Sequence, residues 1–137
     1  MMKKIDVIEV GPRDGFQNLP NYLPVASKLS LIDGLIQSGV KHMQVTSFVS
    51  PKAIPQMKDA KEVAGTCLRK YPGIDLFALI PNFRGAQIAQ EVGMKKVTNV
   101  ISLSESHNKA NINRTRQQSF AELEKIKKSF PDLNVCL

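Results

Sequence analysis

Short apolar runs alternate with segments of helical periodicity along this chain, and this unit recurs four times before a fifth apolar run begins. These runs predict β-strands, and the first of them is rich in β-branched residues. They cover residues 5–10, 40–45, 74–80, 97–103 and 133–137. We expect the first strand, like the others, to be mostly buried, because parallel strands are usually covered on both faces.

The segments between these runs carry apolar residues three and four positions apart, which predicts four amphipathic helices. Their apolar faces comprise Val25, Leu29, Ile32 and Leu35/Ile36; Met57, Ala60, Val63/Ala64 and Cys67; Phe83, Ala86, Ala89 and Val92; and Phe120, Leu123, Ile126 and Phe130. Gly39 supplies a left-handed stop for the first helix. Asn82 is placed to cap the third helix, which runs to Gly93, and Thr115-x-x-Gln118 fits a capping box before the fourth.

Repeated strand–helix units indicate an α/β fold with a parallel sheet and helices outside it. Nothing in residues 1–137 resembles a linker or a low-complexity stretch, so we treat them as one domain. The alternation alone does not separate a barrel from an open, doubly wound sheet. No Gly-x-Gly-x-x-Gly follows the first strand, which argues against a dinucleotide-binding fold.

Composition narrows the function classes. Apolar residues make up 42% of the chain and charged residues 23%, as in ordinary globular proteins. The net charge is +7, but the lysines are scattered and aromatic residues do not alternate with them, so we expect no nucleic-acid partner. No apolar run approaches the ~20 residues that cross a bilayer, and no targeting segment is evident. We therefore expect a cytoplasmic protein without a membrane partner.

Candidate chemistry gathers in loops that follow the strands, where parallel α/β folds place their sites. Three loops are rich in polar residues and in residues of special geometry: residues 11–18, 46–52 and 104–113. In the first, Arg13 and Asp14 are adjacent. Asp14 could bind a divalent cation and Arg13 could stabilise an oxyanion, but a turn-stabilising ion pair explains the two residues equally well. Glu9, inside an apolar run, favours an internal salt bridge over acid catalysis.

Other polar and sulfur-containing residues carry weaker signals. Cys67 and Cys136 form no Cys-x-x-Cys pair, so we interpret both as small core residues. His107 alone makes no metal site, and a surface or hydrogen-bonding role is the better interpretation. Lys52 and Lys109 could contact the phosphates of a cofactor such as CoA, although exposed lysines usually have no such role.

Four motifs, in order, resemble the hydroxymethylglutaryl-CoA lyase family. They are Glu9-Val10-Gly11-Pro12-Arg13-Asp14-Gly15-Phe16-Gln17-Asn18; Thr46-Ser47-Phe48-Val49-Ser50-Pro51-Lys52 with Pro55-Gln56-Met57; Pro81-Asn82-x-x-Gly85; and Ser104-Glu105-Ser106 with Asn111-Ile112-Asn113. The resemblance spans nearly the whole chain. It implies the N-terminal portion of a (β/α)₈ TIM barrel, with four βα units and a fifth strand.

The resemblance also implies an activity. Members of this family use Mg²⁺ or Mn²⁺ to cleave 3-hydroxy-3-methylglutaryl-CoA into acetyl-CoA and acetoacetate. Asp14 would be a metal ligand, Arg13 would stabilise the enolate, and Gln17 and Glu9 would shape the site beside them. The candidates for binding the acyl-CoA are Asn82, Lys52, Lys109 and Asn111. We expect a homo-oligomer for the complete parent protein.

Two departures from the family pattern bear on activity. The family commonly has Glu where this chain has Gln44, which keeps the hydrogen bonding but loses the charge and any proton transfer. The family's His-x-His ligands, a further Asn ligand and a cysteine-bearing loop belong to the later half of the barrel. Since a TIM barrel typically needs ~250 residues, we expect these 137 residues alone to be inactive.

Two alternatives remain open. The parent could be a related metal-dependent condensing or aldol-cleaving enzyme, such as an isopropylmalate or homocitrate synthase. The chain could instead be a non-catalytic half-barrel that pairs with itself or with a separately encoded second half, driven by exposed sheet edges.

Overall fold

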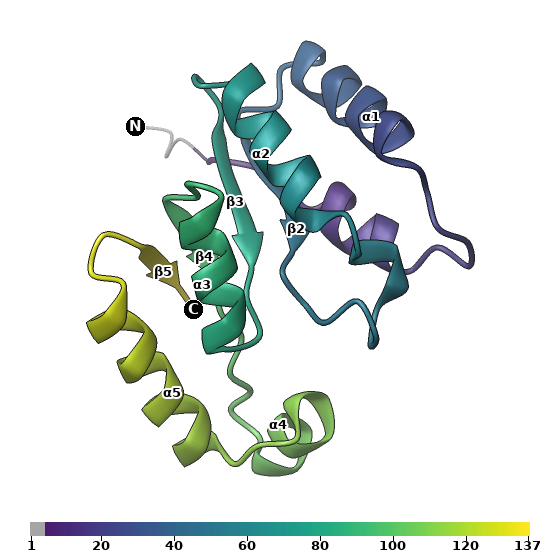
Figure 1. The fold of residues 1–137 in the computed structure, drawn as a ribbon. Helices are drawn as coiled ribbons and strands as arrows, with labels where there is room; N and C mark the ends of the chain where they lie inside the picture. Colours follow the sequence, from purple (N-terminus) through teal and green to yellow (C-terminus); the bar gives the residue numbers. More distant parts are fainter. Residues whose placement is uncertain (1–4) are drawn as a thin grey trace.

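Five parallel strands form a single sheet in the computed structural model, which describes residues 5–137 (Figure 1). The strands are β1 (Ile8–Glu9), β2 (His42–Ser47), β3 (Asp75–Leu79), β4 (Lys96–Thr98) and β5 (Asn134–Cys136). Each strand pairs with the one that follows it in the chain, in the order β1-β2-β3-β4-β5. A doubly wound sheet reverses its strand order at a switch point. The consecutive order is the one that a barrel requires.

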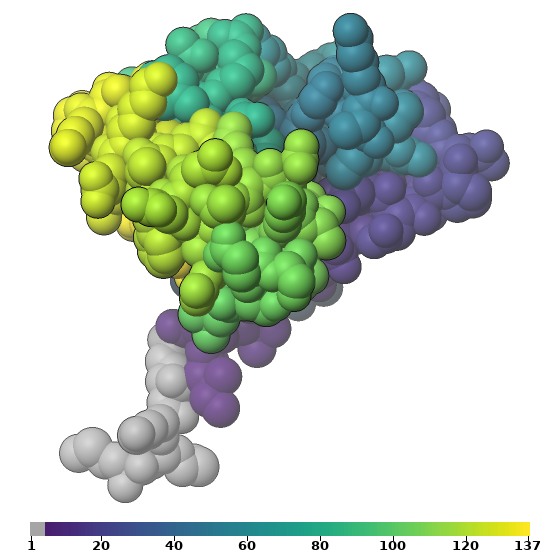
Figure 2. Space-filling model, turned by 90° about the horizontal axis from the view of Figure 1, so that it is seen from below, coloured from purple at the N-terminus to yellow at the C-terminus, as the bar shows by residue number. Residues whose placement is uncertain are grey.

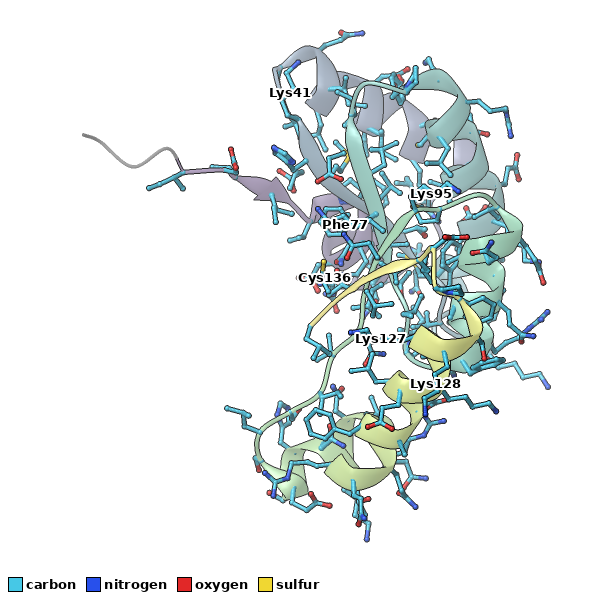
Figure 3. All side chains as sticks on the ribbon, turned by 90° about the vertical axis from the view of Figure 1, so that its left-hand side faces the viewer. Lys41, Phe77, Lys95, Lys127, Lys128 and Cys136 are labelled. Carbon is cyan, nitrogen blue, oxygen red and sulfur yellow. The ribbon has the colours of Figure 1, made fainter. Side chains whose placement is uncertain are left out.

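The four longer helices, of nine or more residues, lie on one face of this sheet, and Figure 3 shows them to the right of the strands. They are α1 (Val25–Gln37), α2 (Ala60–Lys70), α3 (Phe83–Glu91) and α5 (Arg116–Ser129). A shorter helix, α4 (Glu105–Ile112), lies beyond the ends toward which the strand arrows point in Figure 1. Within residues 5–137, no helix has the length and apolar character needed to cross a membrane.

The helix boundaries follow the signals in the sequence. The Asn82 side chain accepts a hydrogen bond from the backbone N–H of Gly85 at 2.9 Å and so begins α3. Both halves of the Thr115/Gln118 capping box form at the start of α5. Gly39 adopts a φ of 104° after α1, a conformation that an L side chain rarely takes, so the predicted left-handed stop is confirmed.

The core lies between the sheet and the four helices. Its most buried members are Ile32, Met43, Val45, Val63, Ala64, Cys67, Ala78, Ile80, Ala86, Ala89, Met94, Val97 and Ile126. The interpretation of Cys67 as a core residue is confirmed. Burial raises the pKa of its thiol to about 11, with a further contribution from Asp33, so Cys67 stays protonated and is a poor nucleophile at neutral pH.

The first strand departs from the prediction. Only Ile8 and Glu9 pair, with His42 and Met43 of β2, and the expected burial of residues 5–10 is wrong. Ile5 is 83% exposed and Val7 78% exposed. The reason is tertiary: β1 has a sheet neighbour on one side only, and Figure 3 shows this segment extending away from the helices.

Three further expectations are corrected. Strand β2 ends two residues later than predicted, at Ser47, and the strand predicted over residues 97–103 pairs only through Thr98. Residues 104–113, expected to be a loop, form α4 between a Ser104 cap and a left-handed Asn113. Phe120 was placed on the buried face of α5 but is half exposed, because the register of the helix buries Ser119 instead.

Charged side chains at the N-terminal ends of three neighbouring strands form a network of ion pairs, which we call the ionic ladder. His42, Asp75 and Lys96 begin β2, β3 and β4. The Asp75 carboxylate lies 3.0 Å from His42 Nδ1 and 2.6 Å from Lys96 Nζ. Desolvation alone would raise the pKa of Asp75, but the hydrogen bonds from Lys96 and His42 outweigh it and hold that pKa below its ordinary value.

Acidification is expected to weaken the fold through this ladder. A carboxylate whose pKa is lowered by folding contributes stability above its unfolded pKa and loses it as the pH falls through the folded value. We therefore expect the stability difference between the wild-type chain and Asp75→Asn to shrink from about pH 5 to about pH 3. Urea unfolding at a series of pH values measures this difference, and a constant difference across the range would contradict the role of the ladder.

Asn108 connects the segment after β4 to helices α4 and α5. It is fully buried and accepts a hydrogen bond from the Ser102 N–H at 3.0 Å. Its side-chain amide donates to the carbonyl of Arg114 and to Ser119 Oγ, both at 2.9 Å. These three bonds fix how the chain passes from α4 into α5, through Arg114, which lines the cleft described below.

Asn108→Ala is expected to lower the free energy of unfolding by about 1–3 kcal/mol, because it leaves buried partners without a hydrogen bond. Thermal or urea unfolding measures the loss. The neighbouring exposed residue offers a matched control, since Lys109→Ala should change stability by no more than about 0.5 kcal/mol. Equal effects of the two variants would show that the Asn108 network does not hold this segment.

Candidate active site

The loop after β1 forms a wide helical turn, η1 (Gly11–Gly15), which carries Arg13 and Asp14. A residue larger than Gly11 at its first position would displace the Glu9 side chain. The backbone N–H of Gly11 donates to Glu9 Oε1 at 2.5 Å, and a Cβ at Gly11 would lie 2.8 Å from that same oxygen. The contact between Glu9 and Gly11 thus positions the turn on the strand that precedes it.

Among residues 5–137, the expected salt bridge of Glu9 is not formed. The Glu9 side chain is partly exposed, and within residues 5–137 it forms no ion pair. Its carboxylate accepts a hydrogen bond from the Gly11 N–H instead. It needs no buried cation, because β1 lies at the sheet edge and is not buried as the apolar run suggested. Glu9 therefore shapes the turn, and it does so through the backbone.

The guanidinium group of Arg13 is held from two sides. Its Nε donates to Gln44 Oε1 at 2.6 Å, and its Nη1 donates to Asp14 Oδ1 at 2.8 Å. Gln44 is only 3% exposed, so its side chain is a fixed acceptor. The Arg13–Asp14 ion pair that the sequence allowed is present, and the link to β2 adds an orientation that a turn alone would not provide.

A break in the strand register places Ser47 on the same face of β2 as Gln44. Gln44 pairs with Phe77 of β3 and Ser47 pairs with Leu79, with a register shift between Gln44 and Thr46. Phe77 and Leu79 are two residues apart and share one face of their strand. Gln44 and Ser47, three residues apart, therefore also share a face. Bulges of this kind re-aim side chains and are frequent beside active sites.

An open cleft of about 590 Å³ lies at this end of the sheet. It is lined by Arg13, Gln17, Val49, Ser50, Ala53, Ile54, Leu79, Ile80, Pro81, Asn82, Val100, Asn111, Ile112 and Arg114. Figure 2 views the molecule from this end, with the segment around α4 (green) against the loop after β2 (blue). The loops after β1, β2, β3 and β4 all contribute to the lining.

The cleft brings together four of the eight residues that the sequence singled out. Arg13, Gln17, Asn82 and Asn111 line it. Asp14 lies beside Arg13 with its side chain 55% exposed. Glu9 lies beneath the turn, whereas the exposed residues Lys52 and Lys109 are not part of the lining.

Arg114 is a lining residue that the sequence analysis missed. It forms an ion pair with Glu122 of α5, whose carboxylate also accepts the backbone N–H of Phe83. The only signal in the sequence was its place between the Asn111-Ile112-Asn113 motif and the Thr115 cap. With Arg13, it gives the cleft two cationic groups. His107, in contrast, is exposed and outside the lining, as its interpretation as a surface residue requires.

The described residues do not make a complete metal site. Within residues 5–137, no group of three or more His, Cys, Asp or Glu side chains could hold an ion. Asp14 has one oxygen bonded to Arg13, which leaves its other oxygen for a cation. One carboxylate fits a single ligand position and no more.

The sequence of this chain is similar to those of known proteins. The family model described as HMGL-like matches residues 4–134. The mitochondrial hydroxymethylglutaryl-CoA lyase of Bos taurus is 42% identical over 127 residues, which cover 93% of this chain and 39% of that protein. The hydroxymethylglutaryl-CoA lyase YngG of Bacillus subtilis is 40% identical over 124 residues, covering 90% of this chain and 41% of that protein.

Solved structures agree. An HMG-CoA lyase from Acinetobacter baumannii, in complex with coenzyme A and 3-methylmalate, superposes with a TM-score of 0.88 at 38% identity, over 95% of this chain and 43% of that one. The HMG-CoA lyase of Bacillus subtilis gives a TM-score of 0.83 at 36% identity, over 98% and 45%. The predicted fold, the N-terminal portion of a TIM barrel, is confirmed.

This chain spans about two fifths of the length of the curated relatives it matches. The family match nevertheless runs from β1 through β4 to the first residue of β5, and through every loop that lines the cleft. The chain belongs to the HMGL-like family.

Proposed function

We propose that this chain supplies one side of the active site of a carbon–carbon lyase that acts on 3-hydroxy-3-methylglutaryl-CoA or a closely similar acyl-CoA. The observation that carries the proposal is the Arg13 guanidinium, fixed by Gln44 and Asp14 at the edge of an open cleft. The two curated relatives described above are named hydroxymethylglutaryl-CoA lyases, which supports this choice over a condensing enzyme such as isopropylmalate synthase.

The proposed chemistry needs a cation where Arg13 lies. Cleavage passes the proton of the C3 hydroxyl to a base, forms the C3=O of acetoacetate and breaks the C2–C3 bond, whose electron pair stays on C2 as the enolate of acetyl-CoA. Uptake of one proton at C2 then gives acetyl-CoA. A guanidinium beside the thioester oxygen stabilises that developing charge. Enzymes of the HMGL-like family depend in general on a divalent metal, and Asp14 would contribute one ligand to it.

The cleft lining lacks a group that could remove the hydroxyl proton. Among the described residues that line it, none is a carboxylate or a histidine. Gln44 cannot act as a base, because an amide side chain does not take up a proton near neutral pH. We therefore propose that the base and the remaining metal ligands come from outside residues 5–137, and that this chain alone is inactive.

Asn82 and Asn111 are proposed to contact the acyl-CoA from the cleft, while Lys52 and Lys109 could contact its phosphates from the surface around it. Asn82 already uses its side-chain oxygen to cap α3, so its amide N–H₂ is the group left for a ligand. We further propose a cytoplasmic, homo-oligomeric parent. Mammalian relatives are mitochondrial by name, whereas the name of the Bacillus subtilis relative specifies no compartment.

The apolar sheet edges favour a second role. Ile5, Val7 and Ile8 at the β1 edge and Leu103 and Leu137 near β5 are exposed, and each of these strands has one sheet neighbour. Such edges favour pairing with further polypeptide. If these residues form a stable half-barrel that pairs with itself, size-exclusion chromatography gives a discrete dimer, whereas a poorly folded monomer would exclude that role.

The proposed activity is tested by incubating the native polypeptide that carries this sequence with 3-hydroxy-3-methylglutaryl-CoA and either Mg²⁺ or Mn²⁺. We expect release of acetyl-CoA and acetoacetate in equal amounts, and loss of activity with a chelator. Isopropylmalate and homocitrate synthase substrates serve as competitors. Condensation of acetyl-CoA with a keto acid, without cleavage, would overturn the proposal.

A further inference from the structure

The hydroxyl of Ser47 is buried without a hydrogen-bond partner in the described part of the chain. Ser47 is 0% exposed and ends β2. Its Oγ makes no bond to any group of residues 5–137. A buried polar group in a native structure nearly always has a partner, and one without a partner calls for an explanation. Packing alone would be served as well by alanine, which fills almost the same space without an unsatisfied hydroxyl.

The bulge in β2 places this hydroxyl on the face of the cleft. Ser47 is in register with Leu79, whose side chain lines the cleft, while Thr46 is in register with Ala78 of the core. Accordingly Thr46 Oγ1 points the other way and contacts the sulfur of Met57 at 3.6 Å. Without the register shift, Ser47 and Gln44 would lie on opposite faces of the strand.

The surroundings of Ser47 define the kind of ligand. Gln44, on the same face, holds Arg13, and the residues that follow Ser47 by two and three positions, Val49 and Ser50, line the cleft. A hydroxyl can donate to an oxygen atom, and the nearby guanidinium attracts negative charge. The matching ligand is therefore a small acyl group that carries a carboxylate or a polarised carbonyl oxygen.

We propose that Ser47 is a substrate-binding residue whose hydroxyl donates a hydrogen bond to an oxygen of the acyl group bound against Arg13. This inference rests on the proposed lyase function. Ser47 is not itself a lining residue, so the acyl group must displace lining side chains to reach its hydroxyl. Two lining residues, Leu79 in register with Ser47 and Arg13 bonded to Gln44 on the same face, are only partly buried and have rotatable side chains. The bound oxygen then gives the Ser47 hydroxyl the partner that it lacks in this structure.

The test uses Ser47→Ala and the matched control Thr46→Val in the native polypeptide. Loss of a hydrogen bond to a charged oxygen typically corresponds to about 10- to 100-fold in affinity or rate. We expect Ser47→Ala to lower kcat/KM for 3-hydroxy-3-methylglutaryl-CoA by that factor, with an unfolding midpoint equal to or above the wild type. Thr46→Val, on the other face, should leave kcat/KM within about twofold. Activity of Ser47→Ala within twofold of the wild type would overturn the inference.

Two further measurements separate the possible failures. If Ser47→Ala does not fold, Ser47→Cys keeps the volume with a much weaker donor and should show the same loss of kcat/KM. If the wild-type protein does not cleave the acyl-CoA, the proposed function fails, and the inference is then tested by calorimetric binding of 3-methylmalate with CoA. Binding that is about tenfold weaker in Ser47→Ala than in the wild type supports the role of Ser47. Equal binding by the two proteins, or no detectable binding by the wild type, contradicts it.

Discussion

Arg13→Lys is expected to lower kcat/KM for acyl-CoA cleavage by about 100- to 1,000-fold, as the loss of an oxyanion-stabilising donor does in other enzymes. Lysine keeps the positive charge but not the planar set of donors. In this structure, Arg13 uses Nε for Gln44 and Nη1 for Asp14, and its remaining N–H groups stay available to a ligand. The three N–H groups of a lysine lie on a single nitrogen, so they cannot reproduce the spread donors that bond Gln44 and Asp14 and still face an enolate. Steady-state kinetics of the native polypeptide measure the effect.

The matched control is Arg84→Lys, on the outer surface of α3. Arg84 is exposed and lies 3.6 Å from Glu91, away from the cleft lining. We expect it to leave both kcat and KM unchanged within twofold, consistent with the small effects of most surface substitutions. If Arg13→Lys were as active as Arg84→Lys, the guanidinium would not be part of the site.

Lys28→Met is expected to lower the free energy of unfolding by about 3–5 kcal/mol, the usual cost of leaving one member of a buried ion pair alone. Lys28 points from α1 into the protein, where its side chain is 2% exposed and that of Asp59 is 6% exposed. The Lys28 ammonium donates to Asp59 Oδ1 at 2.7 Å and to the carbonyl of Gln56 at 2.5 Å. Urea unfolding measures the change.

The double variant Lys28→Met/Asp59→Leu distinguishes the ion pair from simple packing. Removing both charges leaves no isolated buried ion, so most of the lost stability should return. The Tyr22 hydroxyl, which donates a hydrogen bond to Asp59 at 2.9 Å, is exposed and can bond water instead, so losing Asp59 should cost little stability there. A double variant less stable than Lys28→Met would contradict this account and show that the cost comes from lost packing.

The sequence predicted the elements whose causes are local. The Thr115/Gln118 capping box and the Asn82 cap depend on residues within one helical turn, and both are present. The apolar periodicity of α1, α2 and α3 likewise follows from the face that each helix buries. Helix α4 escaped this reasoning because it is polar on nearly every side and buries only Asn108, so no periodic signal marks it.

The features that were missed depend on distant residues. The Lys28–Asp59 and Arg13–Gln44 contacts each join positions 31 residues apart, and a lysine on an otherwise apolar helix face normally indicates exposure. The bulge in β2 cannot be recognised in the sequence. Alternation of apolar and polar residues predicts which residues share a face only if the strand register is regular. The predicted burial of residues 5–10 is wrong for the same kind of reason: an apolar run does not indicate which other elements pack against it.

The candidate site was predicted in part. The motif around Arg13 and Asp14 located the turn, and the order of the loops placed Gln17, Asn82 and Asn111 at one end of the sheet. Spacing could not show that Gln44 orients Arg13, nor that Arg114 lines the same cleft. The roles of Asp14 in metal binding and of Lys52 and Lys109 in acyl-CoA binding stay predictions.

The most direct test of the central claim is a crystal structure of the native polypeptide with CoA and 3-methylmalate, the pair present in the Acinetobacter baumannii relative. We predict that the cleft holds the diacid, with one of its oxygens within hydrogen-bond distance of the Arg13 guanidinium and the CoA leading out past Asn82 and Asn111. A diacid bound elsewhere, with Arg13 still facing only Gln44 and Asp14, would contradict the account.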